Sequence, residues 1–363
     1  MNKISAKVIA DSKNEFGNRI TTLEVIMPRI VLAEFNTHRM FSRNSASSRA
    51  IPFKKMVEAV QINPFIPIAW QKDHKGMQGT KYITKQYNLD TTIFDWLRAR
   101  DEAIRFATVL NLGFEPDGED DSILVDGVTK QLCNRLLEPF MYHKVIITAT
   151  EFENFFNLRC PQYFGKFRSW KDASNLSGAT FETLFINRIN NSQAEIHIQA
   201  VAECMWDAMN ESTPKLLEAG EWHIPYGDNI TKEDLLKYTV KSNKFTITGD
   251  FDINFDNNEE FDKYFIEQKV KIAVARCARV SYTVVGEEGK AADYAKDIIL
   301  YDRLAESGHW SPFEHVAKAM SSNEAIDKHF YDGTKEFDKY SYGWCNNFRG
   351  FIQHRYLLEK IKI

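Results

Sequence analysis

The chain has 363 residues, 44% of them hydrophobic, and carries a formal net charge of -4 with a pI near 6.2. This length suits one large domain or two ordinary ones, and the apolar content excludes wholesale disorder. The acidic balance argues against binding to bulk nucleic acid, which requires a basic face. A small anion held by a few local arginines is still compatible with these numbers.

Location and metal content are constrained by two further patterns. No apolar run approaches the roughly 18 residues that span a membrane. The first five residues, MNKIS, lead straight into a strand-like pattern without the apolar segment of a signal peptide, so we expect a cytoplasmic protein. The five cysteines are scattered and form no CxxC pair, which indicates reduced thiols and neither a zinc site nor a disulfide framework.

The first half of the chain shows alternating strand and helix signals. Residues 20–27 predict a strand with Leu23, Val25 and Met27 on one face. Pro28 suits the first position of a helix that runs to about Asn36. The further elements expected before residue 160 are a helix over 94–112, an acidic loop over 115–121, a helix over 125–138, a strand over 145–148 and a helix over 151–159.

In the second half, residues 194–209 form the strongest amphipathic pattern, with Ile198, Val201 and Met205 directed inward. A helix is also expected over 293–307, with Gly308 just past its end. The region 240–267 is acidic and predicts an irregular surface excursion, whereas 269–280 returns to a core pattern.

The polar stretch from Thr37 to Arg49 carries three arginines, a histidine and five hydroxyl side chains in thirteen residues. Guanidinium groups match phosphate oxygens in a fork, and hydroxyls fill the remaining acceptor positions. The stretch therefore predicts an anion site, most plausibly for a nucleotide phosphate. A solvated, turn-rich linker is the alternative.

Two further clusters carry chemistry. The segment 308–315, GHWSPFEH, holds two histidines, a carboxylate and two aromatic rings. Its alternative interpretation is a helix-to-strand turn with a hydrogen-bonded core histidine. Arg135 and Arg159 form the third cluster, for which ordinary surface arginines are the alternative.

Together these segments resemble the flavin-dependent thymidylate synthase (ThyX) family. The family motif RHRxxSxNxxSxR is matched by THRMFSRNSASSR, at His38, Arg39, Ser42, Asn44, Ser47 and Arg49. Four other family segments, ARxxLP, NFLNLR, ARVSY and HxSPFEH, resemble RLLEP at 135–139, NFFNLR at 154–159, ARVSY at 278–282 and HWSPFEH at 309–315.

The order of these segments differs from that of the family, in which ARVSY and HxSPFEH precede the RHR motif. The chain therefore resembles a circularly permuted member with insertions, in which residues 346–351 would lie near the N-terminal strand and the two chain ends side by side. We expect one ThyX-like catalytic domain of α/β (α+β) class with a mixed sheet. Its core pieces are expected at about 1–160, 192–230 and 269–363, with insertions at about 85–125, 160–191 and 240–268.

The resemblance implies reductive methylation of dUMP to dTMP. It implies FAD as cofactor, NADPH and 5,10-methylenetetrahydrofolate as co-substrates, and a homotetramer with sites between subunits. Substrate is expected to contact Ser47, Arg49, Arg135 and Arg159. Arg159 would also stabilise negative charge on the pyrimidine during attack by C5, which makes it the expected catalytic residue. The cofactor would contact His38, Arg39, Ser42, Asn44, Asn154, Ser281, His309, Ser311 and Glu314.

Four positions depart from the family pattern. Thr37 replaces the first arginine of the motif, Ser45 a glutamate, Glu34 a glutamine and Thr150 an arginine. Arg43 is a candidate to replace the charge missing at Thr37. These changes leave two alternatives open. One is another C5 modification of a pyrimidine nucleotide, such as hydroxymethylation; the other is a non-catalytic protein that binds nucleotide or flavin.

The family uses no cysteine nucleophile. Cys160, beside Arg159, is the one candidate for a reactive thiol. Reactivity requires a lowered pKa, and we expect Cys160 to be an unreactive core or loop cysteine.

Overall fold

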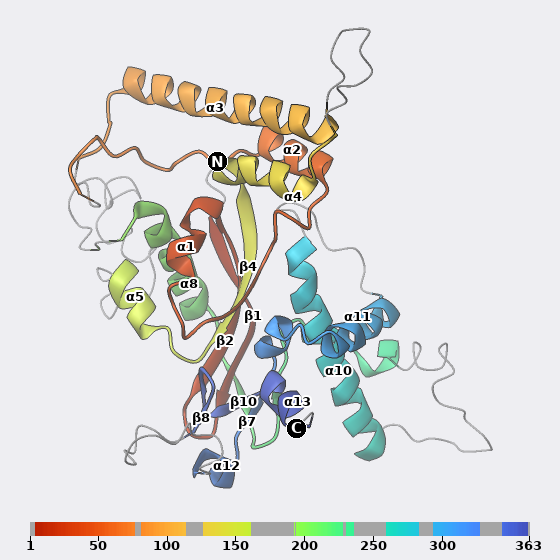
Figure 1. Ribbon diagram of the computed structural model, residues 1–363. Coiled ribbons are helices and arrows are strands. Elements are labelled where there is room, and N and C mark those ends of the chain that lie inside the picture. Colours follow the sequence, from red (N-terminus) through yellow and green to blue (C-terminus); the bar gives the residue numbers. More distant parts are fainter. Residues whose placement is uncertain are drawn as a thin grey trace.

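The computed structural model (Figure 1) describes residues 4–76, 81–113, 126–160, 192, 194–227, 230–235, 259–282, 293–326 and 343–361. The expected acidic loop at 115–121 and most of the expected insertion at 160–191 lie outside these residues.

A five-stranded sheet in the order β3-β4-β2-β1-β5 forms the centre of the molecule. Strand β2 (Arg19–Pro28) lies in the middle and pairs antiparallel with β1 (Ser5–Asn14) and with β4 (Tyr142–Ala149). The short edge strands are β3 (Ser42–Ser45), antiparallel to β4, and β5 (Lys215–Leu217), parallel to β1. The sheet is mixed, and the expected α/β class is confirmed.

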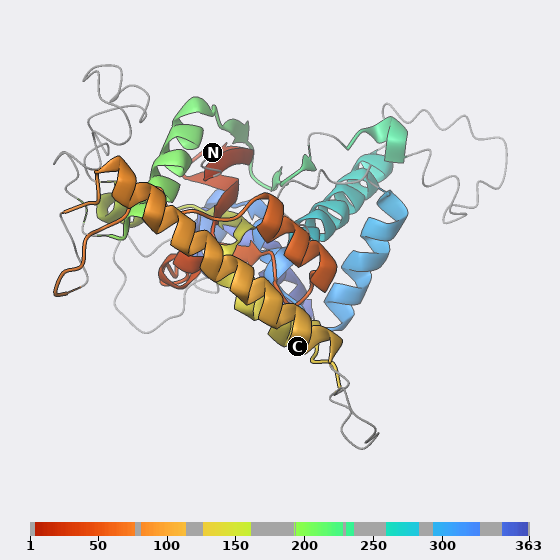
Figure 2. The same cartoon turned by 90° about the horizontal axis from the view of Figure 1, so that it is seen from above.

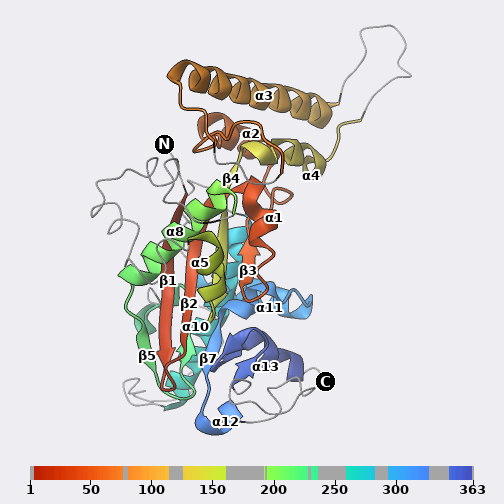
Figure 3. The ribbon, with the colours of Figure 1, turned by 90° about the vertical axis from the view of Figure 1, so that its left-hand side faces the viewer.

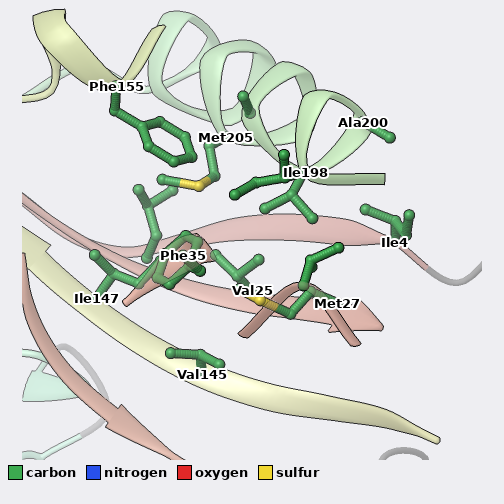
Figure 4. Close-up of a cluster of buried hydrophobic side chains, with 14 of the residues drawn as sticks. Ile4, Val25, Met27, Phe35, Val145, Ile147, Phe155, Ile198, Ala200 and Met205 are labelled. Carbon is green, nitrogen blue, oxygen red and sulfur yellow. The ribbon is translucent and has the colours of Figure 1, made fainter. Parts of the chain in front are cut away.

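One face of the sheet is apolar. Leu23, Val25 and Met27 alternate along β2 and are fully buried, which confirms the face predicted for this strand. They pack against helix α8 (Ile196–Glu211) and helix α5 (Glu153–Arg159), as Figure 4 shows for α8 and Phe155. Helix α8 contributes Ile198, Val201 and Met205, the inward positions expected from its spacing.

The opposite face of the sheet is covered by a second layer, which Figure 3 shows behind the strands. Its three-stranded sheet joins β6 (Trp222–His223), β7 (Ala317–Ala319) and β10 (Phe351–Gln353). Beside it lie the two longer helices α10 (Glu259–Arg279) and α11 (Tyr294–Glu306), and the short 3-10 helices η5 (Val280–Tyr282) and η6 (Ser311–His315). Both faces of the sheet are therefore covered at its central strands β2 and β4.

A helical cap stands at one end of the sheet (Figures 1 and 2). It consists of α2 (Phe53–Ile62), α3 (Gln86–Leu112), α4 (Lys130–Cys133) and the 3-10 helix η2 (Asn134–Phe140), which share one hydrophobic cluster. The remaining elements are η1 (Arg29–Val31), α1 (Leu32–Phe35), α12 (Ser322–Ile326), β8 (Trp344–Cys345), β9 (Phe348–Arg349) and α13 (His354–Ile361).

Three predicted elements differ from the structure. Pro28 ends β2 and precedes the 3-10 helix η1, instead of taking the first position of a helix. The expected helix over 125–138 is α-helical only at Lys130–Cys133 and continues as a 3-10 helix through Pro139, with Leu132 and Leu136 exposed. Their helical spacing was a local coincidence, because the cap packs against Cys133 and Leu137 instead. Residues 240–258 of the irregular excursion expected over 240–267 lie outside the described ranges, and from residue 259, where α10 begins, the expectation is wrong.

The chain ends test the permuted arrangement. Residues 346–351 do lie against the N-terminal strands: Asn14 Nδ2 donates to the Gly350 carbonyl at 2.9 Å, and Phe348 and Phe351 share a cluster with Ile20. However, β1 begins at the end of the sheet near the cap, whereas α13 lies at the opposite end (Figures 1 and 3). The adjacent ends expected of a permuted chain are therefore not found.

No helix within the described ranges combines the length and apolar character required to cross a membrane.

Candidate functional site

The loop between α1 and β3 is fixed at both ends by buried aromatic rings. Phe35 and Phe41 have centroids 5.7 Å apart, and both contact Phe155 of α5, at 5.7 and 5.2 Å. Edge-to-face and tilted contacts at these separations are favourable for aromatic rings. The polar residues between the two phenylalanines are thereby held beside α5.

A pocket of about 590 Å³ opens between this loop and α5. It is lined by Thr37, His38, Arg39, Met40, Phe41, Glu151, Glu153, Asn154, Phe155, Asn157, Leu158 and Arg159. Four of the residues expected from sequence to form the site are thus brought together from two separate segments: His38, Arg39, Asn154 and Arg159.

Arg159 ends α5 and is only 9% exposed. Its guanidinium carbon lies 5.2 Å from the centroid of the Phe155 ring. Burial lowers the pKa of Arg159, and the nearby Glu34 carboxylate opposes that shift. Within the described residues, the buried Nε atom has no hydrogen-bond partner. A cation that has lost hydration and keeps an unused donor is well suited to bind a ligand oxygen.

His38 stands beside Arg159 as a neutral imidazole. Burial, together with the charges of Arg159 and Arg43, lowers the pKa of His38 to about 4. Its ring packs edge-on against Phe155 with centroids 4.8 Å apart, and Nε2 is buried without a partner among the described residues. At neutral pH such a ring has one donor and one acceptor nitrogen.

The rim of the pocket is polar and exposed. Arg39 and Asn154 lie on it, and Thr37 donates from Oγ1 to the Glu34 carbonyl at 2.6 Å. Glu151 and Glu153 also line the pocket, although no sequence motif singles them out. Burial raises the pKa of the Glu151 carboxyl. The positive charge of Arg349 opposes this shift, and the negative charge of Glu153 adds to it.

A second group of expected site residues forms internal hydrogen bonds around β3. The Asn44 amide donates to the Cys277 carbonyl at 2.7 Å and accepts from Ser281 Oγ at 3.2 Å. Ser311 Oγ donates to the Arg43 carbonyl at 2.9 Å, and buried Ser42 accepts from Asn347 at 3.1 Å. These side chains join β3 to η5, η6 and the C-terminal segment, so their polar atoms are already engaged.

Two charged residues near this group are also engaged. The Arg43 guanidinium donates to the carbonyls of Phe35, Asn36 and His38, so it caps the end of α1. Glu314 forms a 2.5 Å ion pair with Arg355 of α13. His309 is exposed and follows Gly308, whose φ of +70° confirms the expected helix end.

Arg49 and Arg135 are both exposed and lie outside this pocket. Asn134 Nδ2 donates to the Ser48 carbonyl at 2.7 Å, which holds the backbones next to both arginines together. The backbone N–H of Ser47 donates to the Ser281 carbonyl at 3.1 Å. Three of the residues expected to bind substrate thus lie between β3 and the cap, whereas Arg159 lies in the pocket beside α5.

Within the described parts of the chain, no group of three or more His, Cys, Asp or Glu side chains is arranged to hold a metal ion.

Comparison with known proteins gives a fold-level likeness only. No protein-family model and no curated protein matches this chain. Among solved structures, it is similar to the UMP/dUMP methylase PolB from Streptomyces cacaoi bound to 5-Br UMP, with 14% identity and a TM-score of 0.34, and to the same protein bound to 5-Br dUMP, with 13% identity and a TM-score of 0.35. Each match covers 58% of this chain and 94% of the other. At these values the likeness assigns no function to this chain.

Proposed function

We propose that this protein is a flavin-dependent thymidylate synthase, which methylates C5 of dUMP with methylenetetrahydrofolate and NADPH. The proposal rests chiefly on one observation. The two segments that resemble the family's RHR and NFLNLR motifs line one pocket, where they place the buried cation of Arg159 beside the neutral ring of His38.

Two further contacts support this proposal. The segment resembling ARVSY bonds to the polar loop through Ser281 and Ser47, and the segment resembling HxSPFEH bonds to it through Ser311 and Arg43. The polar segment from Thr37 to Ser47 is therefore contacted by three other segments that come from separate parts of the sequence. Such convergence is expected if they build a common site.

The proposed role of Arg159 follows from its surroundings. A guanidinium with a free Nε donor can bind a pyrimidine carbonyl oxygen and stabilise the enolate-like negative charge that this oxygen carries when C5 is activated as a nucleophile. The donor is worth more in a partly desolvated pocket than in water. Ser47, Arg49 and Arg135 would bind the phosphate, and their separation from Arg159 suggests that phosphate and base are held by different subunits of the proposed homotetramer.

The residues of this chain fit a flavin in part. His38, Arg39 and Asn154 present polar atoms to the pocket, and one buried nitrogen of His38 has no partner among the described residues. In contrast, Ser42, Asn44, Ser281, Ser311 and Glu314 are engaged within the protein, and we assign them to shaping the β3 wall. When bound, FAD would supply the hydride transfer from NADPH that the reductive step requires.

A second candidate function is another C5 modification of a pyrimidine nucleotide, such as hydroxymethylation. It is favoured by Thr37, a neutral residue on the pocket rim whose hydroxyl is bonded to the Glu34 carbonyl. The pocket thus has one positive charge fewer than the family motif implies. The same change is compatible with a non-catalytic protein that binds nucleotide or flavin.

Three measurements on the purified protein separate these functions. A flavin band in the visible spectrum and formation of dTMP from dUMP, methylenetetrahydrofolate and NADPH would support the thymidylate synthase. Mass spectrometry showing a hydroxymethylated product would support the second candidate instead. Nucleotide binding without turnover under any reductant would favour the non-catalytic protein, and absence of both flavin and nucleotide binding would contradict all three.

A further inference from the structure

A continuous chain of hydrogen bonds crosses the interior of the molecule. Ser12 Oγ lies 2.9 Å from His223 Nδ1, and His223 Nε2 lies 2.8 Å from Thr22 Oγ1. Thr22 Oγ1 lies 2.7 Å from Thr148 Oγ1, which in turn lies 2.9 Å from His315 Nδ1. The five side chains come from β1, β6, β2, β4 and η6, and none is more than 5% exposed.

Strand register explains how the chain forms. Thr22 pairs with Thr148, and Ala10 pairs with Thr22, so Thr22, Thr148 and Ser12 share one face of the central sheet. This is the face opposite α8, and His223 and His315 of the second layer pack against it. The chain is therefore built jointly by both layers.

The two ends of the chain have different surroundings. Ser12 lines a cleft of about 1220 Å³ that runs beside β1 and α10, so this end reaches water. At the other end, His315 Nε2 is buried and has no hydrogen-bond partner among the residues that the structure describes. Neither the cleft nor this nitrogen has a role in the function proposed above.

Both imidazoles are neutral, which lets each pass on one hydrogen. Burial lowers the pKa of His223 to about 3, with Asp11 opposing the shift, and burial with the nearby His223 lowers that of His315 to about 3. A neutral ring donates from one nitrogen and accepts at the other, and a hydroxyl does both. Each of the five groups has one hydrogen to donate. All four hydrogen bonds can form, with both threonine hydroxyls donating within the chain, in only two arrangements, and every bond of one arrangement has the reverse donor and acceptor in the other.

The two arrangements impose the same tautomer on both rings. In one, His315 Nδ1 donates to Thr148, Thr148 to Thr22, Thr22 to His223 Nε2, and His223 Nδ1 to Ser12, so both rings carry Nδ1–H. In the other, every bond is reversed and both rings carry Nε2–H. The first leaves His315 Nε2 as an unpaired acceptor and the second leaves it as an unpaired donor, which costs more when buried. The Nδ1–H arrangement is thus the resting one.

We propose that these five side chains form a proton relay. In this relay His223 and His315 always have the same tautomer, and both rings change tautomer at the same time. Transfer begins when His315 Nε2, the unpaired acceptor at the buried end, takes up a proton. Each group then passes its own hydrogen to the next, and the Ser12 hydroxyl releases one to water in the cleft. One proton enters, one leaves and every group ends neutral. The proposal does not depend on the identity of the nucleotide.

The test is a tautomer measurement on the full chain labelled with ¹⁵N-histidine, using long-range ¹H–¹⁵N correlation spectra at pH 7. The His223→Gln and His315→Gln variants assign the two signals. We expect both rings to be Nδ1–H, which is the minor tautomer of free neutral histidine. In Ser12→Ala, the donor His223 Nδ1–H loses its acceptor, so the Nε2–H fraction should rise equally at both rings.

Thr148→Val removes the central hydroxyl at nearly constant volume and should separate the two rings. His223 is then expected to keep Nδ1–H, because Thr22 still donates to its Nε2, whereas His315 should revert to Nε2–H. Thr148→Ser retains the hydroxyl and should preserve the common tautomer, which also controls for loss of the threonine methyl. Opposite tautomers in the unaltered protein, or a Ser12→Ala response confined to His223, would overturn the relay.

Discussion

Replacing Arg159 with glutamine is expected to weaken nucleotide binding while leaving the fold stable. A hydrogen bond to a charged group contributes about 1.5–3 kcal/mol, so its loss corresponds to a roughly 10- to 150-fold rise in Kd for dUMP. For folding, the lost cation–π contact with Phe155 contributes on the order of 1 kcal/mol, and the favourable removal of a buried charge opposes that loss. The buried Nε has no partner among the described residues, so glutamine breaks no bond there.

Calorimetric titration of dUMP and urea unfolding measure the two effects separately. Arg159→Lys should fall between the parent and Arg159→Gln, because lysine keeps the charge and loses the planar fork. Arg98→Gln is the matched control, since Arg98 lies on α3 over Phe94, away from the pocket. The reasoning is refuted if Arg159→Gln binds dUMP as the parent does while its unfolding midpoint shows an intact fold.

Three further predictions concern stability and reactivity. Gly350→Ala should lower the free energy of unfolding by about 2–4 kcal/mol, because Gly350 has φ +74° and an added Cβ would lie 2.3 Å from Asn14 Nδ2. Gly76 has φ +98° with open space around it, so Gly76→Ala should lower the free energy of urea unfolding clearly less. The urea midpoint should fall as pH drops from 6.5 toward 4, because buried neutral histidines such as His143, with a pKa near 3, bind protons only when unfolded; His143→Gln should flatten that slope. Burial raises the pKa of the Cys160 thiol, so Cys160→Ala should retain activity and iodoacetamide should leave this thiol unmodified in the folded protein; rapid labelling would contradict this.

The apolar face of the central sheet was predictable from sequence because its cause is local. Alternation of Leu23, Val25 and Met27 along one strand is sufficient to indicate a strand with one buried face. The pocket was predictable in part: His38 and Arg159 were selected from motif resemblance, and the structure places both in it. Glu151 and Glu153 were missed, because carboxylates at the start of a predicted helix give no sequence signal of facing a pocket.

The polar face of the same sheet was not predictable. Thr22 and Thr148 alternate with apolar residues, a pattern that normally indicates a face open to solvent. Both are nevertheless fully buried, because residues 222–223 and 311–315, remote in the sequence, cover them. Likewise, Ser42 and Ser311 were expected to contact a cofactor, whereas their hydroxyls bind within the protein, a distinction that depends on tertiary contacts alone.

The two faces of the sheet together specify its register, and the site depends on that register. A slip of one residue between β2 and its neighbours would turn Leu23 toward His223 and bury Thr22 among the apolar side chains under α8. Each error would leave polar groups unpaired in the interior, which is costly. Because Thr148 also pairs with Ser42 of β3, the same constraint fixes the strand that leads out of the polar loop. The hydroxyl–imidazole chain thus supports the strand that follows the pocket loop, whichever direction its hydrogens run. Thr148→Val, which removes the shared hydroxyl, should therefore speed amide hydrogen exchange in β3 as well as separate the two tautomers, and unchanged exchange would contradict this role.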